Sequence, residues 1–566
     1  MTAKVKYISG PPAPQLDPTL SLAEVVFAGL KRNNVKATAQ VEVETGRELT
    51  YGHLARQSLS VVQGLLREGV GEGSTVAIVS FNSQEAHVIF LACILIGATA
   101  APLDPSLLPE EMAALLELVS PTVVYTEGGK TLRKIEAALT LLENEPLLVV
   151  SGRNKHPYTS FQSLLQPTDP EFRPSITNIE EHVALILFTS GTSGLPKGVM
   201  LSDAYLLMSV KCLRNDVPEL AFLLTSPLFW LSGVISILTI ITCGFKMIFL
   251  RGPAKEAVIL STIQNYKVNI WMAAPTTLQS LLVFPSRGAY DISTLQIVNS
   301  GGAALSADSQ LRIQRELFRN RTMLLQVYGM TELGGVAVSA PGRIKPGACG
   351  TLTVGTSVKI EDIETGESLG PGEEGEVCVK VKYFMLGYAK NPEATSATFD
   401  EDGWFHTGDI GYYDEEGYLY IIDRLKDLIK YKSYQIAPAE IENVLRTHPA
   451  VKDCSVFGIP HPTDGDHATA FVVAHKNVTE NELLEYVAER VSENKQIRGG
   501  IRFVEFIPRT STGKPKRRAL RSQLMAELQG INFMKRWKTS SVKEKKNTKN
   551  NQLVPVKKKI LDLPQN

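Results

Sequence analysis

Cysteine is scarce in this 566-residue chain, and its six copies show none of the paired spacings that hold a metal ion or a disulfide framework. They are scattered as Cys93, Cys212, Cys243, Cys349, Cys378 and Cys454. Isolated cysteines of this kind are typical of reduced thiols in a cytosol-like compartment, where they serve as small core residues. We therefore expect neither a disulfide-stabilised fold nor a cysteine metal site.

Net charge is also absent, because 59 Lys and Arg residues balance 59 Asp and Glu residues. No field of one sign steers the whole chain toward nucleic acid or an anionic membrane, so no nucleic-acid partner is expected. The exception is segment 535–559, with ten Lys or Arg against one Glu. This run predicts a solvated, disordered tail. The alternative is an electrostatic tether to RNA or a membrane, the latter giving weak membrane association.

Targeting and membrane signals are missing from the sequence as given. Residues 1–18 contain no apolar signal-peptide core, and the ending DLPQN is not a peroxisomal tripeptide. Residues 220–245 carry no charge and are long enough to span a bilayer. Pro and Gly residues interrupt them, so we predict a buried strand–turn–helix–strand unit and no transmembrane segment. A cytoplasmic location is the resulting expectation.

Hydrophobic residues, by contrast, make up 44% of the chain, enough for more than one domain. Between about residues 23 and 300, short apolar runs alternate with helical periodicity, which is typical of parallel sheets covered by helices. Segment 359–381 alternates apolar and polar residues between Gly and Pro turns and predicts β-hairpins. A further α/β unit follows a boundary expected within 423–426, and one of its helices should begin at or near Pro438.

A loop rich in glycine and hydroxyl groups follows an apolar run in LILFTSGTSGLPKGVMLS, residues 185–202. Its glycines expose backbone N–H groups, its hydroxyls add donors and Lys197 supplies positive charge, so it is suited to hold phosphate. A Walker A loop places lysine directly after the last glycine and Ser or Thr after the lysine. Here Gly198 follows Lys197, so the loop is not of that type.

Five further motifs follow this loop in order along the chain. They are NSGGAAL (299–305), QVYGMTE (326–332), GWFHTGD (403–409), DRLKDLIKYKSYQIAPAEIE (423–442) and RTSTGKPKRRAL (509–520). Together the six motifs resemble those of the adenylate-forming superfamily, which includes acyl-CoA synthetases, 4-coumarate–CoA ligases and beetle luciferases. The resemblance covers roughly residues 23–525.

The resemblance implies an α/β fold. A large N-terminal domain would combine αβ-layered subdomains with a β-rich subdomain, and a small, mobile α+β C-terminal domain would follow. The implied boundaries are 23–423 for the AMP-binding adenylation domain, 424–525 for the mobile domain and 526–566 for the basic tail.

The implied reaction joins a small carboxylic acid to ATP, giving acyl-AMP and pyrophosphate, and then transfers the acyl group to CoA. ATP, Mg²⁺ and CoA would be the cofactors. The resemblance also keeps a peroxisomal location open as an alternative.

Family resemblance assigns the phosphates of ATP to the loop and to the QVYGMTE motif. Lys197 and its neighbours would hold the β- and γ-phosphates and guide pyrophosphate away. Those neighbours are Thr189, Ser190, Gly191, Thr192, Ser193 and Gly194. Thr331 would bind the α-phosphate, and Glu332 would bind Mg²⁺, because hard cations prefer carboxylate oxygens.

Adenosine would lie against the other large-domain motifs. Tyr328 would stack on adenine, in the motif that also contains Gln326 and Gly329, beside the backbone of Gly301, Gly302 and Ala303. Asp409 would accept both ribose hydroxyls, and Arg424 would donate to the same sugar or its phosphate.

The C-terminal motifs would serve the two half-reactions separately. Lys514 would act on the carboxylate and α-phosphate during adenylation, so the implied catalytic set is Lys197, Thr331, Glu332 and Lys514. Lys426 matches the hinge about which the small domain rotates. The positions facing AMP and CoA after rotation are Lys430, Lys432, Ser433 and Gln435.

Two departures from the family pattern concern the second half-reaction and the acid. Ser433 stands where a glycine usually leaves room beside the pantetheine arm, so CoA could bind normally, weakly or not at all. Phe229 and Trp230 stand where related ligases and luciferases commonly have histidine, which makes light emission less expected. Trp230 resembles the aromatic gate of some fatty acyl-CoA synthetases; core packing is the alternative.

The resemblance also implies an acyl pocket, with Gly334 and Gly335 leaving space for a long or bulky acid. Its members would be Trp230, Ser232, Ser300, Gly302, Gly334 and Val336. The leading hypothesis is an ATP-dependent acid–CoA ligase for a medium- or long-chain fatty acid or an aryl-propenoic acid, with a role in fatty acid metabolism. The alternatives are a luciferase-like monooxygenase and a degenerate adenylate-binding protein.

Overall fold

The computed structural model forms two compact units, residues 1–426 and 427–566, and the division falls directly after Lys426. It describes residues 6–17, 20–152, 157–174, 178–189, 196–210, 220–432, 434–461, 464–509 and 514–528. Of the predicted basic tail, residues 526–528 end a helix and the remainder lies outside the described residues. Each unit is described by itself below.

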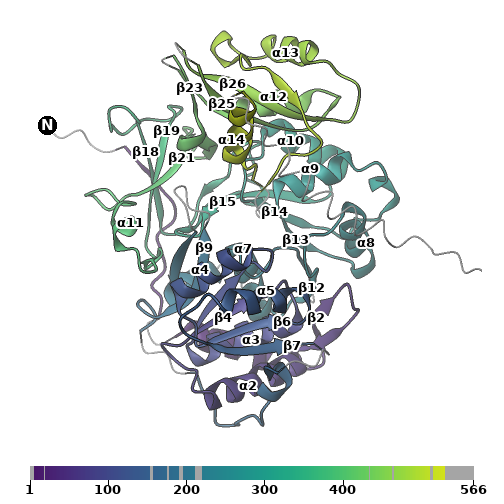
Figure 1. The fold of residues 1–566 in the computed structure, drawn as a ribbon, viewed down its shortest axis with the longest axis vertical. Coiled ribbons are helices and arrows are strands. Elements are labelled where there is room, and N and C mark those ends of the chain that lie inside the picture. Colours follow the sequence, from purple (N-terminus) through teal and green to yellow (C-terminus); the bar gives the residue numbers. More distant parts are fainter. Residues whose placement is uncertain are drawn as a thin grey trace, which may run out of the picture. The chain divides into compact units, whose positions relative to one another are not determined.

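One sheet of the large unit contains eight strands, most of them parallel (Figure 1). Their spatial order is β20 (Gly387–Tyr388), β10 (Lys197–Ser202), β9 (Val183–Thr189), β5 (Thr99–Leu103), β4 (Thr75–Val79), β6 (Val123–Glu127), β7 (Leu147–Ser151) and β8 (Thr159–Ser160). Strands β10 and β20 are antiparallel additions at one edge. This edge carries Lys197.

A second sheet contains nine strands and is parallel from β15 to β2. Its spatial order is β17 (Thr351–Leu352), β16 (Gly334–Val338), β15 (Met323–Met330), β14 (Ile297–Gly301), β13 (Ile270–Ala273), β11 (Ala221–Leu224), β12 (Lys246–Phe249), β2 (Thr38–Glu42) and β3 (Glu48–Thr50). The QVYGMTE and NSGGAAL motifs therefore lie on neighbouring strands.

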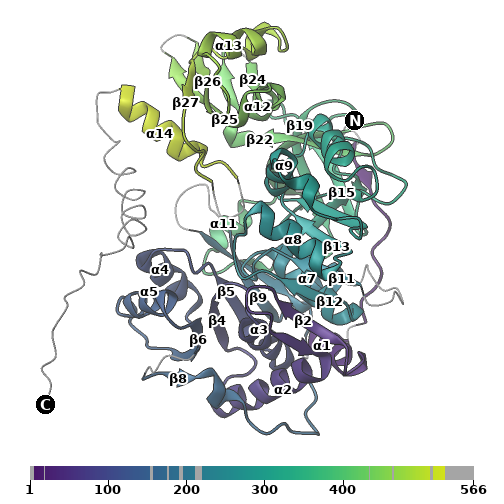
Figure 2. The same cartoon turned by 90° about the vertical axis from the view of Figure 1, so that its right-hand side faces the viewer.

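Helices cover both faces of both sheets (Figure 2). Those packed between the sheets are α1 (Leu22–Arg32), α2 (Tyr51–Arg67), α3 (Gln84–Ile96), α6 (Asp203–Val210) and α7 (Leu231–Cys243). The outer faces are covered by α4 (Pro109–Val119) and α5 (Lys130–Leu139) on one sheet, and by α8 (Glu256–Tyr266) and α9 (Pro275–Val283) on the other.

The strand pattern explains this layering. Side chains of a strand alternate between the two faces of its sheet. In β12, Met247 and Phe249 therefore pack into the central layer while Ile248 packs against the outer helices. Apolar residues on both faces are what a doubly covered parallel sheet requires.

The uncharged segment 220–245 forms β11, the helix α7 and a turn into β12, so the predicted strand–turn–helix–strand unit is confirmed. Within the described part of the chain, every helix is too short or too polar to cross a membrane. The predicted core role of cysteine also fits, because Cys93, Cys378 and Cys454 are buried free thiols.

A β-rich subdomain completes the large unit. Its antiparallel strands are, in order, β1 (Ile8–Ser9), β18 (Thr356–Glu361), β19 (Gly375–Val381), β21 (Phe405–Tyr413) and β22 (Leu419–Arg424), with α11 (Pro392–Ser396) nearby in sequence. The hairpin predicted in 359–381 is formed by β18 and β19. The predicted fold class is thereby confirmed for the large unit.

The small unit is an α+β unit. Its sheet contains β24 (Tyr434–Ile436), β23 (Ile429–Tyr431), β26 (Gly465–Ala474), β25 (Val451–His461) and β27 (Ile501–Phe503), and its helices are α12 (Pro438–Thr447), α13 (Glu480–Ala488) and α14 (Arg517–Leu528). Helix α12 begins at Pro438 as predicted, since proline at the first helical position loses no intrahelical hydrogen bond.

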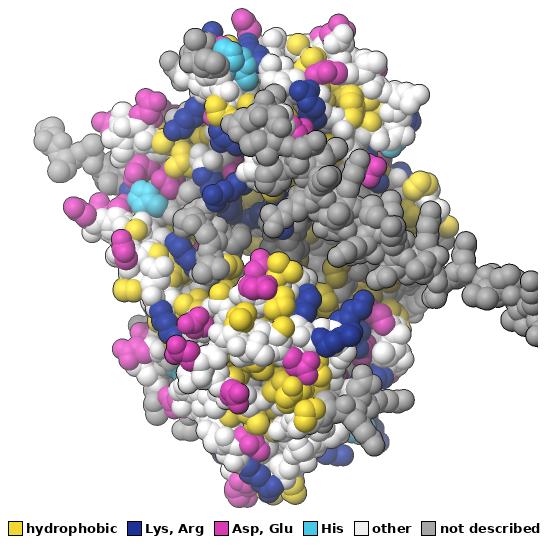
Figure 3. Space-filling view, viewed as in Figure 1, with side chains coloured by type: hydrophobic (Ala, Val, Ile, Leu, Met, Phe, Trp, Pro, Cys, Tyr) yellow, Lys and Arg dark blue, Asp and Glu magenta, His cyan; other side chains and the backbone are white. Residues whose placement is uncertain are grey.

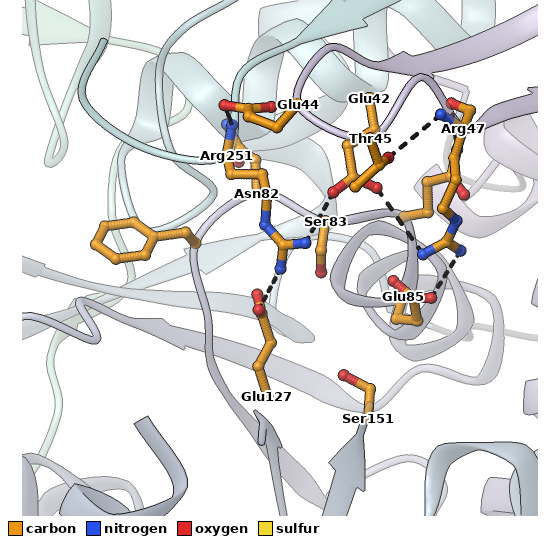
Figure 4. A network of polar contacts seen from close by, with 12 residues as sticks. Glu42, Glu44, Thr45, Arg47, Asn82, Ser83, Glu85, Glu127, Ser151 and Arg251 are labelled. Carbon is orange, nitrogen blue, oxygen red and sulfur yellow. Dashed lines mark hydrogen bonds and ion pairs between the residues drawn. The ribbon is translucent and has the colours of Figure 1, made fainter. Parts of the chain in front are cut away.

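An ion-pair network connects the two sheets of the large unit (Figure 4). Arg251, just after β12, pairs with Glu42 of β2 at 2.8 Å and with Glu127 at the end of β6. Arg47 pairs with Glu85 at 2.8 Å. Elsewhere on the face shown in Figure 3, side chains of both charge signs are interspersed, as the balanced composition implies.

Candidate active site

The candidate site begins at the carboxyl edge of the nine-stranded sheet. Strands β11, β13, β14 and β15 are parallel, so the segments that follow them emerge at one edge. Ligands of open α/β sheets bind at such an edge. Three segments are expected to contact the substrates: 226–233 follows β11, 301–303 begins at the last residue of β14, and 331–332 follows β15.

The segment after β14 presents exposed backbone. Gly301 lies so close to β15 that a Cβ atom would stand 2.6 Å from the Val327 carbonyl oxygen. Gly302 has a φ of +87° and open space where a side chain would project, and it is exposed, as is Ala303. A flat ligand can therefore approach this backbone. Ser300 is buried, and its hydroxyl has no hydrogen-bond partner among the described residues.

The carboxylate of Glu332 is buried, and the residues that donate hydrogen bonds to Glu332 come from a distant part of the sequence. The Tyr388 hydroxyl donates to Glu332 Oε1 at 3.0 Å, and the Met385 amide donates to the Glu332 carbonyl oxygen at 2.8 Å. Burial raises the pKa of the Glu332 carboxyl, while the Tyr388 hydrogen bond and the charges of Arg424 and Lys197 act in the opposite direction. Tyr388 contacts both Glu332 and Lys197, and the charge of Arg424 also acts on the Glu332 carboxylate.

Lys197 opens β10, opposite Thr189 at the end of β9. Its ammonium lies 4.5 Å from the ring centroid of Tyr388, a cation–π distance. Tyr388 is in turn carried by β20, which pairs with β10. Residues Ser190, Gly191, Thr192, Ser193 and Gly194 of the loop between β9 and β10 lie outside the described residues.

The turn from β15 to β16 positions Thr331 and needs two glycines. The Tyr205 hydroxyl donates to the Thr331 carbonyl oxygen at 2.9 Å. Gly334 has a φ of +77°, and a Cβ there would stand 3.3 Å from the Tyr205 hydroxyl oxygen. At Gly329 a Cβ would stand 2.2 Å from the Gly334 carbonyl oxygen, so no larger residue fits.

Tyr328, Asp409 and Arg424 form a second cluster. The Tyr328 hydroxyl donates to Asp409 Oδ2 at 2.8 Å, and Arg424 Nε lies 3.3 Å from Asp409 Oδ1. Asp409 and Arg424 are directly opposite each other on β21 and β22. Burial, followed by the charge of Asp409, raises the pKa of Tyr328 well above its usual value. The adenine-stacking and ribose-binding candidates are therefore directly linked.

Candidates on the acyl side differ in exposure. Trp230, at the start of α7, is partly buried with its ring edge-on to Phe229 at 6.0 Å. Ser232 is also partly buried, and its carbonyl oxygen accepts from the Ser236 hydroxyl at 2.6 Å. Val336 is fully buried in the central hydrophobic layer. Of these residues, Trp230 and Ser232 thus retain side-chain exposure.

Gln326 serves a structural contact in β15. Its amide nitrogen donates to Gln310 Oε1 at 2.9 Å, and the same oxygen accepts the Gly347 amide at 2.9 Å. Both glutamines are buried. This network fixes the strand beneath Tyr328.

In the small unit, Lys430 is exposed on β23, and Lys432 is exposed with a φ of +51°. The Lys432 amide donates to the Asp464 carbonyl oxygen at 2.6 Å. Lys514 is partly buried. Ser433 and the side chain of Gln435 lie outside the described residues. In the large unit, Lys426 is exposed in the short helix Leu425–Asp427.

Sequence reasoning missed Tyr388 and Tyr205, which hold Glu332 and Thr331. Tyr388 lies in no motif that we recognised, and Tyr205 lies in the family-like segment LSDAYL (201–206), where it was assigned no role. The available signal was weak: the segment FMLGYAKN (384–391) places one tyrosine among loop-forming residues. Only the pairing of β20 with β10 shows that this tyrosine belongs to the site.

Comparisons with known proteins identify the family of this chain. The AMP-binding enzyme family matches residues 28–389, and the AMP-binding enzyme C-terminal domain matches residues 440–514. A luciferin 4-monooxygenase from Nipponoluciola cruciata is 36% identical over 506 residues, covering 86% of this chain and 91% of that protein. A 4-coumarate–CoA ligase from Humulus lupulus is 34% identical over 505 residues, covering 85% and 90%.

Among solved structures, an anthranilate CoA ligase in complex with anthranoyl-AMP superposes with a TM-score of 0.83 at 26% identity, covering 91% of this chain and 99% of that one. The chain therefore belongs to the AMP-binding enzyme family. More specifically, it is a member of the adenylate-forming acyl- and aryl-CoA ligase family, whose enzymes use ATP and which also contains luciferases.

Proposed function

We propose that this protein is an ATP-dependent acid–CoA ligase that forms an acyl-AMP and then an acyl-CoA. The observation that carries the proposal is the buried Glu332 carboxylate at the carboxyl edge of the nine-stranded sheet, because it accepts a hydrogen bond from Tyr388, whose ring lies 4.5 Å from the Lys197 ammonium. The positive charge of Arg424 also acts on this carboxylate. Adenylation brings two anions together at the α-phosphorus, so a site for it needs fixed positive charge and aligned donors. This arrangement provides the positive charge.

In this proposal Lys197 and the loop after β9 bind the β- and γ-phosphates, and Thr331 binds the α-phosphate. Asp409 and Arg424 bind the ribose, with Tyr328 and the open backbone of 301–303 against adenine. The direct Tyr328–Asp409 hydrogen bond supports a common adenosine-binding role for both residues.

The Glu332 carboxylate is suited to bind Mg²⁺. It is buried, its pKa is raised by burial, and Tyr388 occupies only one of its two oxygens. A divalent cation beside it would offset that burial cost, because carboxylate oxygens are the ligands that Mg²⁺ prefers. Mg²⁺ would neutralise phosphate charge, and the protein residues would hold the substrates in place.

The small unit would supply the remaining groups. Lys514 would act during adenylation, and Lys430, Lys432 and Gln435 would act during thioester formation after rotation about Lys426. The division of the structure directly after Lys426 supports this hinge position. Ser433 would then lie beside the pantetheine arm and affect the second step alone.

For the acid, we propose a medium- or long-chain fatty acid or an aryl-propenoic acid. The partly buried Trp230 supports an apolar acid, since its ring stands at the carboxyl edge next to Phe229. Gly335 supports a bulky one, because it is exposed and, among the described residues, only the Thr353 methyl group comes within 4.0 Å of where its Cβ would stand. For location we propose the cytoplasm, with the peroxisome as the alternative and weak membrane association through the basic tail.

A luciferase-like monooxygenase is the second candidate, because luciferin 4-monooxygenases are among the relatives with more than 30% identity. It would use the same adenylation, followed by attack of oxygen on the α-carbon. The aromatic pair Phe229–Trp230 favours the ligase, since it leaves the pocket without the polar histidine of the luciferases. A third candidate, a degenerate adenylate-binding protein, conflicts with the retention of Lys197, Glu332, Asp409, Arg424, Lys430 and Lys514.

The test is a pyrophosphate-release assay over a panel of acids, with and without CoA. Mass spectrometry would identify the thioester, and luminescence with luciferin would be recorded in parallel. We expect acid-dependent release and a CoA thioester without light. Pyrophosphate release that is the same with and without CoA, and no thioester, would contradict the ligase function but support adenylation. Absence of pyrophosphate release would contradict both.

A further inference from the structure

Three side chains of metal-ligating types lie together at one hairpin of the small unit, apart from the residues with proposed roles in the reaction. The long hairpin of β25 and β26, labelled in Figure 1, contains the sequence HPTDGDH (461–467), of which the structure describes residue 461 and residues 464–467. His461 Nδ1 lies 3.6 Å from Asp464 Oδ2, and His467 Nε2 lies 3.0 Å from the same oxygen. One nitrogen of each imidazole thus lies within 3.6 Å of the same carboxylate oxygen.

The register of the hairpin produces this convergence. His461 is opposite Gly465, and His467 is opposite Ile459, so the two histidines are diagonal neighbours across the turn. Their rings are stacked, with centroids 3.9 Å apart and planes 12° from parallel, so one ring must rotate for both in-plane nitrogen lone pairs to bind one ion. One candidate ligand atom from each of the three residues lies within 4.8 Å of the other two. The backbone therefore brings all three ligands together without a long-range contact.

The spacing suits a tetrahedral ion. Zn²⁺ binds imidazole nitrogen and carboxylate oxygen at about 2.0–2.2 Å, which places neighbouring ligand atoms of a tetrahedron roughly 3.3–3.5 Å apart. The observed separations of 3.0 and 3.6 Å lie on either side of that value. From this geometry we infer that His461, Asp464 and His467 form a binding site for a divalent transition metal ion such as Zn²⁺.

The site is accessible to an ion from solvent. The side chains of His461, Asp464 and His467 are 39%, 25% and 18% exposed. Three protein ligands leave one tetrahedral position for water, as in other zinc sites with two histidines and one carboxylate.

A second group with the right atom types does not support the same inference. Glu361, Cys378 and His406 lie together in the β-rich subdomain. There the Lys359 ammonium already lies 2.6 Å from Glu361 Oε2, and burial raises the pKa of the Cys378 thiol, which opposes the thiolate form. A resident cation and a protonated thiol make it a poor metal site.

The metal site adjoins β23, which contains Lys430 and is followed directly by Lys432. The Lys432 amide donates to the Asp464 carbonyl oxygen at 2.6 Å, and Tyr431 is opposite Gly465. The Tyr431 ring lies 5.8 Å from His467. Metal binding would therefore stiffen the end of β23. Any effect of metal binding on thioester formation rests on the proposed function, whereas the metal site itself does not depend on that function.

The test is Zn²⁺ titration of the full-length, chelator-treated chain in competition with a chromophoric zinc chelator. We expect the double variant H461N/H467N to lose one bound Zn²⁺ per chain. The variant D464N should weaken that site at least about tenfold, the loss typical of altering even the partners of a metal's ligands. The matched control H53N/H475N removes two exposed histidines elsewhere and should bind as the unaltered chain does.

Circular dichroism and thermal unfolding in excess chelator show whether each variant folds. If H461N/H467N fails to fold, D464N alone decides. Unchanged zinc stoichiometry and affinity in the folded variants would overturn the inference, as would an unaltered chain that takes up no Zn²⁺. Because the readout is zinc binding, the result is independent of any ligase activity.

Discussion

At the scale of single residues, Tyr388 is a positioning residue for the carboxylate on which the proposed magnesium site depends. We predict that Tyr388→Phe slows acid-dependent pyrophosphate release at least about tenfold, because a hydrogen bond to a charged group contributes about 1.5–3 kcal/mol. Loss of the donor also raises the pKa of Glu332 further, so the acid limb of the pH–rate profile should move to higher pH. Pyrophosphate release measured across pH tests both effects.

Tyr420→Phe is the matched control for this change. It removes a tyrosine hydroxyl that donates to Asp414 at 3.2 Å, in the β-rich subdomain and outside the proposed site. We expect its rate and pH profile to be unchanged. Equal rates for the Tyr388 variant and the unaltered chain would show that Glu332 is held well enough without the hydroxyl.

His87 makes the stability of the large unit sensitive to acid. Its ring is fully buried edge-on to Phe249 at 4.9 Å, and neither ring nitrogen has a hydrogen-bond partner among the described residues. Burial lowers the pKa of His87 from 6.5 to about 3. The unfolded chain therefore binds one more proton than the folded chain between these two values, so stability falls as the pH falls below 6.5.

We predict that His87→Leu removes this dependence. Relative to neutral pH, the histidine should cost about 2 kcal/mol at pH 5, as linkage between these pKa values requires. Urea unfolding at both pH values, followed by tryptophan fluorescence, would measure the difference. His53→Leu, at an exposed position, is the control. Equal acid sensitivity of all three proteins would mean that His87 is protonated or solvated in the folded state.

Sequence motifs were informative for residues whose chemistry is local and uninformative for those that act through tertiary contacts. Lys197, Glu332 and Arg424 stand in recognisable strings, and the structure brings them together. Tyr388 could not be predicted, because its role depends on pairing between β20 and β10. The hydrogen bond from Tyr328 to Asp409 was also unforeseen, since a stacking role says nothing about the hydroxyl.

At the scale of elements, the Arg251 network joins strands of the two sheets. Glu42 is fully buried on β2, and Arg251 is its nearest cation at 2.8 Å, while Arg47 lies 3.9 Å away. Removing one partner of a buried ion pair leaves an uncompensated charge. We predict that Arg251→Met lowers the free energy of unfolding by about 3 kcal/mol, measured from the urea midpoint.

The exposed neighbour provides the comparison. Arg47 is 49% exposed, so Arg47→Met should cost less than about 1 kcal/mol. Adding Glu42→Gln to Arg251→Met should restore part of the lost stability, because the buried charge is then gone. A single variant at Arg251 as stable as the unaltered chain would show that water or Arg47 compensates Glu42.

Helices and strands were predicted correctly where the pattern of apolar residues within the segment determines its structure. The apolar run 220–245 and the alternating segment 359–381 folded as predicted, because strand and helix periodicities are properties of neighbouring residues. The order of strands was not predictable in the same way. Strand β11 pairs with both β12 and β13, and β20 joins a sheet whose other strands come from the first 202 residues.

At the scale of the whole molecule, two units joined directly after Lys426 raise the question of how one chain catalyses two steps. The proposed function assigns Lys514 to adenylation and Lys430 to thioester formation, and both belong to the small unit. If each lysine serves one step, replacing Lys514 should impair adenylation alone, and replacing Lys430 should impair thioester formation alone. A single shared site would instead make both changes affect both steps.

We therefore predict that Lys514→Ala slows acid-dependent pyrophosphate exchange by about 10²–10³, the usual cost of losing a donor to developing charge, while supplied acyl-AMP and CoA are still converted to thioester. Lys430→Ala should leave exchange intact and slow that conversion. Each lysine change serves as the control for the other, since both remove one ammonium from the same unit. Parallel loss of both activities in either variant would contradict the division of labour, because a folded small unit would then be serving the two steps with one set of groups.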